Sequence, residues 1–374
     1  MCGQCHGIHR PPAPLPRFTR SPDDWRDHGL AYRPGDDLEA SRYLVGRERV
    51  GERRFQEIVA FDPHLMADRF WSDGMVRVSG REYNGLIESP CFVRGVGPKK
   101  LSCLSCHRLH PEPGDPRPLR EWANDQLAVG MDGNGACLQC HARFADDATL
   151  LGHTHHAADS SGSRCVNCHM PYTTYGLLKA IRSHTIDSPS VAALRDTGRP
   201  IACNQCHLDR TVAWTAKQLE AWYGLPHPAL PPLLAAVPAS IVWALGGDAG
   251  QRALAAWSFG WPAALEASAS SDDWIAPFLA QLLDDPYDAV RIVAARSLRR
   301  QPGFADFPIE ANAPPAKQRS AVTRAWRRWR ERRARAGRPV DPTYLIDPSA
   351  GALRARIFPL LRARRNDGRV FLAE

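Results

Sequence analysis

Ten of the eleven cysteines form five pairs with two residues between the thiols, and a histidine directly follows every pair. Cys-x-x-Cys-His is the attachment motif of c-type haem, in which both thiols add to the vinyl groups of one porphyrin and the adjacent imidazole binds the iron. The sequence therefore predicts about five covalently bound haem c groups. Their thioether positions are Cys2, Cys5, Cys103, Cys106, Cys137, Cys140, Cys165, Cys168, Cys203 and Cys206. Their proximal iron ligands are His6, His107, His141, His169 and His207.

Other cysteine chemistry explains the pattern less well. A zinc site also uses Cys-x-x-Cys, but it needs two such halves and has no rule that places histidine after every second cysteine. A redox dithiol would be a single pair beside a βαβ unit, and structural disulfides do not favour a two-residue gap. Cys91 alone lacks a partner and a following histidine. We interpret it as a buried, inert thiol, with a reactive thiol as the alternative.

Electron-transfer haems usually take a second strong ligand opposite the proximal histidine. Nine histidines lie outside the motifs and could supply it: His9, His28, His64, His110, His153, His155, His156, His184 and His227. Methionine also serves in some cytochromes, but the chain has only five, and Met1 and Met170 are poorly placed. We therefore expect bis-histidine iron, with several of the spare imidazoles left as surface or core residues.

The haem motifs also predict the compartment. Haem is attached to them outside the cytoplasm, so we expect a periplasmic or otherwise exported protein. Met1 is followed directly by Cys2 without a signal peptide, and we expect that signal to lie upstream. The formal charge of +8 suggests nucleic-acid binding, but haem propionates would bring the loaded protein near neutrality, so we expect no nucleic-acid partner. The sequence has no apolar run of about 18 residues, so it predicts no transmembrane segment.

The elements that position the motifs differ along the chain, and together they predict a mainly α protein. Residues 1–100 hold the first motif and a small β-hairpin, with strands at Phe70-Trp71 and Met75–Val78 and an end at Asn84-Gly85. Residues 101–225 hold four motifs, which is too little chain to wall off each macrocycle with its own core. We predict a tetrahaem cytochrome c domain there, with little regular secondary structure and a final helix at Thr211–Tyr223.

Helical periodicity replaces haem motifs in residues 226–338. One predicted helix covers about 274–282, with Ser271 and Asp272 as cap residues, and the next covers about 290–298. The segment Asp248–Ala256 resembles Asp288–Ala295 at an offset of about 39 or 40 residues, which is the length of a HEAT repeat. We therefore predict a short HEAT-like α-solenoid.

The last helix of this domain is strongly basic. Residues 317–338 carry ten Lys or Arg against one acid, Glu331. One face of this helix is apolar and carries Val322, Ala325, Trp326 and Trp329. The polar side is either an ordinary solvated surface or a patch for anionic lipid headgroups or an acidic redox partner. Residues 339–374 form a C-terminal tail with one more helix.

Residues 103–224 resemble the multihaem cytochrome c proteins that join a haem domain to tetratricopeptide or HEAT repeats. The resemblance rests on the stretches Cys137–His141, Cys165–Pro171, Arg182–His184, Ala202–His207 and Trp222–Gly224, and on the His153/His156 pair. The segment Arg81–Ser89, upstream of Cys103, is also similar to this group. Members of the group are distant relatives of the pentahaem nitrite reductases.

The resemblance implies bis-histidine haems and names their distal ligands. These are His110, His153, His156 and His184, whereas His155 does not match the pattern. For the fifth haem we expect His28, with His9 as the next choice. The nitrite reductases bind their catalytic haem through Cys-x-x-Cys-Lys, and this sequence contains no such motif.

The leading hypothesis is a periplasmic multihaem cytochrome that carries electrons between redox partner proteins and has no catalytic residues. In this hypothesis the helical repeat docks a partner or braces the haem domain, and peripheral membrane contact is left open. The alternative is a reductase of a small nitrogen or sulfur oxyanion with one open haem, for which the first motif is the preferred site. A third hypothesis is a scaffold in which the repeat binds partners and the haems only support the fold.

Overall fold

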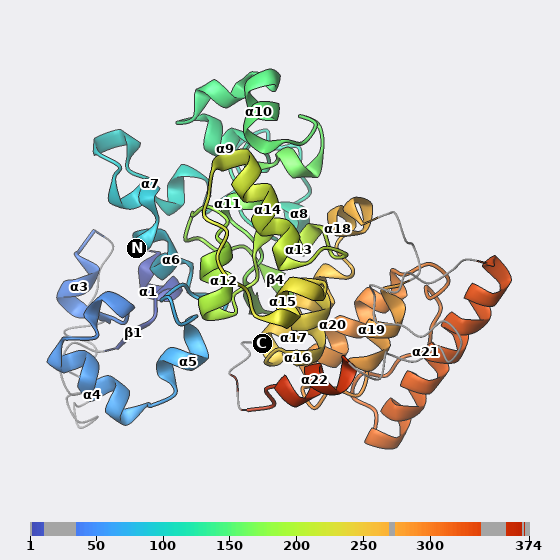
Figure 1. Ribbon diagram of the computed structural model, residues 1–374. Coiled ribbons are helices and arrows are strands. Elements are labelled where there is room, and N and C mark those ends of the chain that lie inside the picture. The colour runs from blue at the N-terminus through green and yellow to red at the C-terminus, as the bar shows by residue number, and fades with distance from the viewer. Residues whose placement is uncertain (1, 11–34, 269–273, 338–356, 369, 371–374) are drawn as a thin grey trace. The chain divides into compact units, whose positions relative to one another are not determined.

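The computed structural model describes residues 2–10, 35–268, 274–337, 357–368 and 370 (Figure 1). These residues are mainly helical and include two small antiparallel strand pairs, which confirms the mainly α class. The chain divides into two compact units. Unit 1 comprises Met1–Met170 and Ser183–Ser188, and unit 2 comprises Pro171–Arg182 and Pro189–Glu374. Unit 1 therefore carries the first four haem motifs and unit 2 carries the fifth.

The first part of unit 1 surrounds a small apolar core. Its helices are α1 (Gly3–His6), α3 (Leu38–Ser41), α4 (Arg53–Phe61), α5 (Leu65–Arg69), α6 (Glu82–Glu88) and α7 (Pro90–Val93). Strand β1 (His9–Arg10) pairs antiparallel with β2 (Tyr43–Leu44). The core is formed by Ile8, Tyr43, Val45, Phe55, Ile58, Leu65, Phe70, Val76 and Val78. The strand pair thus fixes the segment that directly follows the first motif.

The predicted hairpin is present in a minimal form. Phe70 and Val76 form an antiparallel bridge, and the Trp71 amide donates to the Met75 carbonyl across the turn. Gly74 takes a φ of 94°, which a residue with a side chain rarely adopts. The tight turn ahead of α6 is therefore confirmed.

The expected end of the hairpin at Asn84-Gly85 is wrong, because both residues lie inside α6. An Asn-Gly pair usually marks a turn because both residues tolerate positive φ. Here Gly85 serves close packing instead. A Cβ atom at this position would lie 2.8 Å from the backbone nitrogen of Thr185.

Residues 101–170 form short helical turns joined by loops. The elements are η3 (Cys103–Ser105), α8 (Leu119–Trp122), α9 (Gly135–Leu138), η4 (Ala142–Ala145), α10 (Asp147–Thr154), η5 (Ser161–Ser163) and α11 (Cys165–His169). All residues of this stretch are described, and its buried apolar side chains are Trp122, Ala128 and Leu150. Three such residues cannot offset the entropy of ordering seventy residues. This stretch has no sufficient protein core of its own.

Unit 2 begins with a hairpin that the sequence analysis did not predict. Strand β3 (Thr174–Gly176) pairs antiparallel with β4 (Lys179–Ile181). The two turn residues, Leu177 and Leu178, both have a φ of 53°. Turns of this kind normally use Asn or Gly, so a Leu-Leu turn carries no recognisable signal.

The rest of unit 2 is helical. Its helices are α12 (Val191–Thr197), α13 (Ala202–Cys206), α14 (Val212–Tyr223), α15 (Pro232–Ala236), α16 (Ala239–Gly246), α17 (Ala249–Ser258), α18 (Pro262–Ala267), α19 (Ala276–Gln281), α20 (Asp288–Arg299), α21 (Pro315–Ala336) and α22 (Phe358–Arg364). Helix α14 begins and ends as predicted, with the Thr211 side chain accepting from the Trp214 amide and Gly224 in the left-handed conformation. Helices α19 and α20 confirm the two predicted helices, although the expected caps Ser271 and Asp272 lie outside the described residues.

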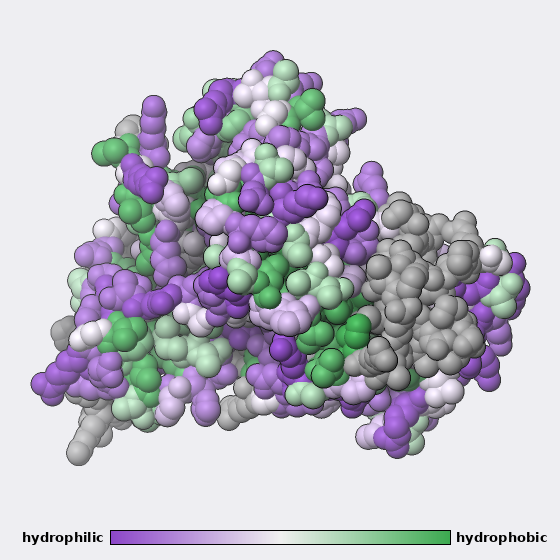
Figure 2. Space-filling view, in the orientation of Figure 1, coloured by the Kyte–Doolittle hydropathy of each residue, from purple (hydrophilic) through white to green (hydrophobic). Residues whose placement is uncertain are grey.

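Helices α16, α17, α19, α20 and α21 contact one another and bury apolar side chains. Helix α17 contacts α16 and α20, while α19 contacts α20 and α21. The largest buried aromatic side chains are Phe259, Trp274, Phe278, Phe304 and Trp329. Helix α21 buries Ala321, Ala325 and Trp329, which are spaced by one helical turn, and its visible side is hydrophilic in Figure 2. Val322 and Trp326, also expected on the apolar face, are half-buried.

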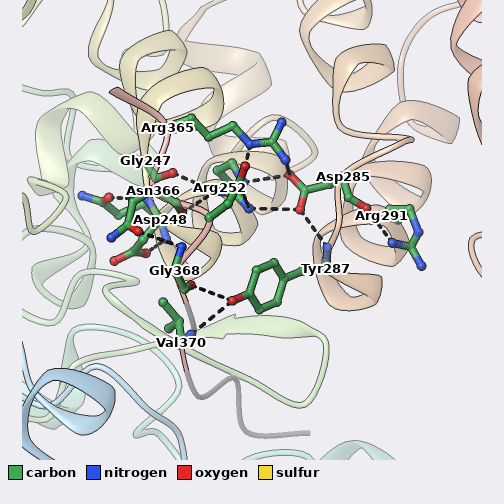
Figure 3. A network of polar contacts seen from close by, with 12 residues as sticks. Gly247, Asp248, Arg252, Asp285, Tyr287, Arg291, Arg365, Asn366, Gly368 and Val370 are labelled. Carbon is green, nitrogen blue, oxygen red and sulfur yellow. Dashed lines mark hydrogen bonds and ion pairs between the residues drawn. The ribbon is translucent and has the colours of Figure 1, made fainter. Parts of the chain in front are cut away.

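A buried ion pair joins α17 to the loop between α19 and α20 (Figure 3). The Arg252 guanidinium on α17 donates to both carboxylate oxygens of Asp285, at 2.7 and 3.1 Å, and both side chains are fully buried. The same Asp285 carboxylate lies 3.3 Å from the Arg365 guanidinium. Arg252 also donates to the carbonyl of Asn366, so the network holds the segment after α22 against α17.

No helix among the described residues has both the length and the apolar character needed to cross a membrane.

Candidate functional site

All eleven cysteines lie among the described residues, and none of them forms a disulfide. The thiols of neighbouring motifs in unit 1 approach one another. The side chain of Cys2 lies within hydrogen-bonding distance of Cys103, and burial together with this neighbour raises the pKa of Cys103 to about 11. Burial and the nearby Cys140 raise the pKa of Cys106. Motif 1 therefore lies next to motif 2, and motif 2 next to motif 3.

A third thiol contact extends this row to motif 4. The interaction between the neighbouring Cys137 and Cys165 thiols raises the pKa of Cys137 and lowers that of Cys165 to about 7. Asn134 joins the same two motifs, because its side chain accepts from the Cys165 amide at 2.9 Å and donates to the Ser163 carbonyl. The four motifs of unit 1 thus follow one another in space in chain order. Cys91 is half-buried near Cys137, not buried as expected.

Three proximal histidines are oriented by a partner at Nδ1. The Nδ1 atoms of His107 and His169 lie 2.8 Å from the backbone carbonyls of Asp125 and Asp187. The Nδ1 atom of His6 lies 2.8 Å from a carboxylate oxygen of Glu82. A histidine that donates from Nδ1 presents Nε2 to a metal, and metal-binding histidines in proteins almost always have such a partner.

Two of these motif imidazoles lie near a predicted distal histidine. The ring centres of His169 and His153 are 6.1 Å apart with planes 4° from parallel, and those of His107 and His184 are 6.2 Å apart at 26°. Metal–imidazole bonds of about 2.0 Å, with each ring centre about 1.1 Å behind its nitrogen, place two imidazoles on opposite sides of one metal about 6.2 Å apart. Both ring-centre separations therefore match the spacing expected of two axial ligands of one iron.

The remaining distal candidates are not in these ring pairs. His110 is exposed, and His156 is half-buried with Nδ1 2.6 Å from the Thr154 carbonyl. His155, which does not match the family pattern, is exposed with a φ of 56°. His28 lies outside the described residues. The Nε2 atom of His9 is 2.6 Å from the Gln4 carbonyl, so this nitrogen already has a partner.

Helix α6 holds motif 1 in place, which the sequence analysis did not foresee. The Asn84 side chain is buried and accepts from the Ile8 amide at 2.6 Å while donating to the Val45 carbonyl. The Arg81 guanidinium donates to the carbonyl of Cys5. Asn84 and Arg81 both belong to the segment Arg81–Ser89 that the sequence singled out, but their roles in holding motif 1 were not predictable from it.

Glu82 is the member of this segment that contacts His6, the histidine of motif 1. Burial alone would raise its pKa, but hydrogen bonds from His6 and from the backbone amide of Gly80, and the nearby His184, hold the pKa below its usual range. The residue is therefore a carboxylate at neutral pH.

Motif 5 in unit 2 is held by the two residues between its cysteines. Asn204 is fully buried, donates to the Arg210 carbonyl and accepts from the Thr215 hydroxyl. Gln205 bonds both the amide and the carbonyl of Tyr172, so it ties the motif to the segment leading into β3. The ring centres of His207 and Trp214 lie 5.0 Å apart.

Comparison with protein-family models, with curated proteins and with solved structures found no significant match. A search of the described residues found no group of three or more His, Cys, Asp or Glu side chains arranged to hold a metal ion. A bis-histidine haem needs only two protein ligands for its iron, because the porphyrin supplies the others.

Proposed function

We propose that this chain is a multihaem c-type cytochrome that carries electrons through about five covalently bound haems. The observation that carries the proposal is the pair of imidazole–imidazole separations, 6.1 and 6.2 Å, each between a motif histidine and a predicted distal histidine. His184 lies far along the chain from His107, so local sequence does not bring them together. When bound, haem supplies iron that accepts and releases one electron at a time.

The residues of each motif would have separate tasks. The cysteine thiols would hold the porphyrin edge, and the proximal imidazole would bind the iron through Nε2 because Nδ1 is engaged. His153 and His184 would occupy the opposite faces at motifs 4 and 2. With both axial positions taken, neither of these sites has room for an oxyanion, which favours a carrier over a reductase.

Two further features support the haem hypothesis. The first is the scarcity of buried apolar side chains in residues 101–170, which a set of large apolar macrocycles would remedy. The second is the row of motifs 1 to 4, since electron carriers need closely spaced centres. Attachment of haem to these motifs would require export, so we also propose a periplasmic or otherwise exported location.

We propose the basic face of α21 as the docking surface for an acidic redox partner. The apolar side of α21 is used for packing inside unit 2, so it is not free to enter a lipid interface. Arg319, Arg327 and Arg330 are exposed and point away from that side. A cationic surface steers and orients a partner of opposite charge. The α16–α21 region, which we propose is a short HEAT-like repeat, would present this helix.

Absorption and electron paramagnetic resonance spectra of the exported, haem-loaded protein test the function. A carrier is expected to show low-spin, six-coordinate iron throughout and no binding of carbon monoxide or nitrite. A high-spin fraction of about one-fifth that binds nitrite would contradict the carrier and support the reductase, because one haem in five would have an open face.

A further inference from the structure

The first motif differs from its neighbours in what its proximal histidine touches. His6 donates to a side-chain carboxylate, Glu82, whereas His107 and His169 donate to backbone carbonyls, all at 2.8 Å. The other oxygen of Glu82 accepts from the Gly80 amide at 2.9 Å. Both oxygens are therefore engaged, and the carboxylate is fixed beside the imidazole. Its side chain is 23% exposed, so water screens its charge only in part.

A carboxylate acts on a metal-bound imidazole more strongly than a carbonyl does. Hydrogen bonds to an ionised acceptor are about twice as strong as those between neutral groups. The bond draws the Nδ1 proton toward the carboxylate, which makes Nε2 a stronger donor to the metal. A more electron-rich ligand and a nearby negative charge both favour ferric over ferrous iron, so they lower the reduction potential.

We propose that Glu82 is a positioning residue that lowers the reduction potential of the haem held by Cys2, Cys5 and His6 relative to the haems of motifs 2 and 4. The proposal rests on the function proposed above. One electron shared between motifs 1 and 2 would then favour motif 2: ferrous iron at motif 1 becomes ferric, ferric iron at motif 2 becomes ferrous, and no bond forms or breaks. This bias would make the motif 1 end of the row the side at which electrons enter.

Redox titration of the haem-loaded Glu82→Gln variant tests the proposal. Glutamine keeps the length and an acceptor oxygen but removes the charge. The reduction potential of one haem, seen as one component of the titration, is expected to rise by about 59 mV. This shift corresponds to a change of about tenfold in the equilibrium constant of a one-electron reduction. Glu52→Gln is the matched control, because Glu52 accepts a hydrogen bond from the Tyr43 hydroxyl in unit 1 without touching a haem ligand. In this control variant, the reduction potentials of all the haems should stay near their wild-type values.

A second background identifies the haem that moves. In Cys2→Ala/Cys5→Ala protein, which would lack the first haem, Glu82→Gln is expected to leave the remaining components unchanged. A shift that persists in this background would overturn the proposal, as would unchanged potentials in the Glu82→Gln protein with all haems low-spin. The proposed electron-carrier function would survive either result. Protein that carries no haem in the wild type would instead overturn that function.

Glu82→Asp keeps the charge but shortens the side chain, so it should raise the same component less than Glu82→Gln does. This variant also covers the case in which Glu82→Gln fails to load the first haem. An unchanged potential in Glu82→Asp would then count against the proposal. Loss of the first haem in both variants would make Glu82 a residue of assembly and would overturn the role in tuning.

Discussion

The histidines of unit 1 are oriented by groups that the haem motif itself does not contain. The backbone carbonyls of Asp125 and Asp187 fix two proximal rings, and Glu82 fixes a third. In the proposed cytochrome the motif histidine would bind the iron, and its partner at Nδ1 would set how the ring is turned and how basic it is. The proposed function would therefore depend on residues up to 76 positions away in the chain.

Replacing His153 by alanine tests one distal assignment. The Ala variant should open one face of the haem at motif 4, because the ring that lies 6.1 Å from His169 is gone. About one-fifth of the iron should become high-spin and bind carbon monoxide. Spectra with and without carbon monoxide measure this fraction. His155→Ala is the matched control, because His155 is exposed two residues away and should leave the spectrum unchanged. Equal spectra for the two variants would exclude His153 as a ligand.

Glu88 should give unit 1 a distinct pH dependence. Burial, and then repulsion from Glu48 and Asp73, raise its pKa to about 7, against the opposing effect of Arg47. The unfolded chain loses this proton near pH 4.3, so between about pH 4 and pH 7 the folded state holds more protons. The free energy of unfolding should therefore fall as the pH rises through this window and level off above it.

The Glu88→Gln variant should lose this part of the pH dependence. The measurement is the free energy of denaturant unfolding across that window in both proteins. Glu57→Gln, at a fully exposed carboxylate of α4, is the control and should keep the wild-type slope. A Glu88→Gln curve parallel to the wild type would contradict the raised pKa.

At the scale of elements, the predictable helices are those with their own local signals. Thr211 and Gly224 bound α14, and Asp248 with Gln251 forms a capping box at the start of α17. The β3–β4 hairpin was not predictable, because its turn uses Leu177 and Leu178 at positive φ. Gly85 was assigned to a turn because its need for close packing becomes visible only when residues 184 and 185 are in place.

Two buried arginines, Arg252 on α17 and Arg291 on α20, occupy matching positions in the similar segments Asp248–Ala256 and Asp288–Ala295. Both converge on Asp285, Arg252 through the carboxylate and Arg291 through the backbone carbonyl. The spacing of about 39 or 40 residues predicted two similar helices. It did not show that Asp285, between them, accepts hydrogen bonds from both arginines.

The Arg252→Met variant tests this network. Removing Arg252 leaves the buried Asp285 carboxylate with Arg365 as its remaining ion-pair partner, so unit 2 should lose about 3 kcal/mol of stability. Denaturant unfolding followed by helical circular dichroism measures the loss. Arg319→Met, on the exposed side of α21, should change stability by less than about 0.5 kcal/mol. The double variant Arg252→Met/Asp285→Leu should recover most of the loss. Equal stability of the two single variants would show that the ion pair is unimportant.

At the scale of the whole molecule, residues 101–170 and helices α16 to α21 differ in the source of their stability. Helices α16 to α21 bury many apolar side chains, whereas residues 101–170 bury three. The sequence predicted this contrast, because four motifs were crowded into residues 101–225 and periodicity began after them. It did not predict the division between units, in which Pro171–Arg182 joins unit 2 while Ser183–Ser188, with His184, joins unit 1. The assignment of these two short segments to different units depends on contacts between residues that are distant in the sequence.

Amide hydrogen exchange of the chain with and without haem tests this contrast. Without haem, residues 101–170 should exchange rapidly, since few apolar contacts protect them. Loading with haem should slow exchange there, while α16, α17 and α20 should be protected in both forms. Mass spectrometry of peptides measures the difference. Strong protection of residues 101–170 in the haem-free chain would mean that the protein alone provides their core.

The intact mass of the folded protein, produced with export and haem-attachment machinery, tests the central claim most directly. We predict the mass of the chain plus five haems, retained under denaturing conditions because thioether bonds are covalent. Replacing Cys165 and Cys168 by alanine should reduce the increment by one haem. A folded protein with the mass of the bare chain, its thiols free or bound to zinc, would contradict the account.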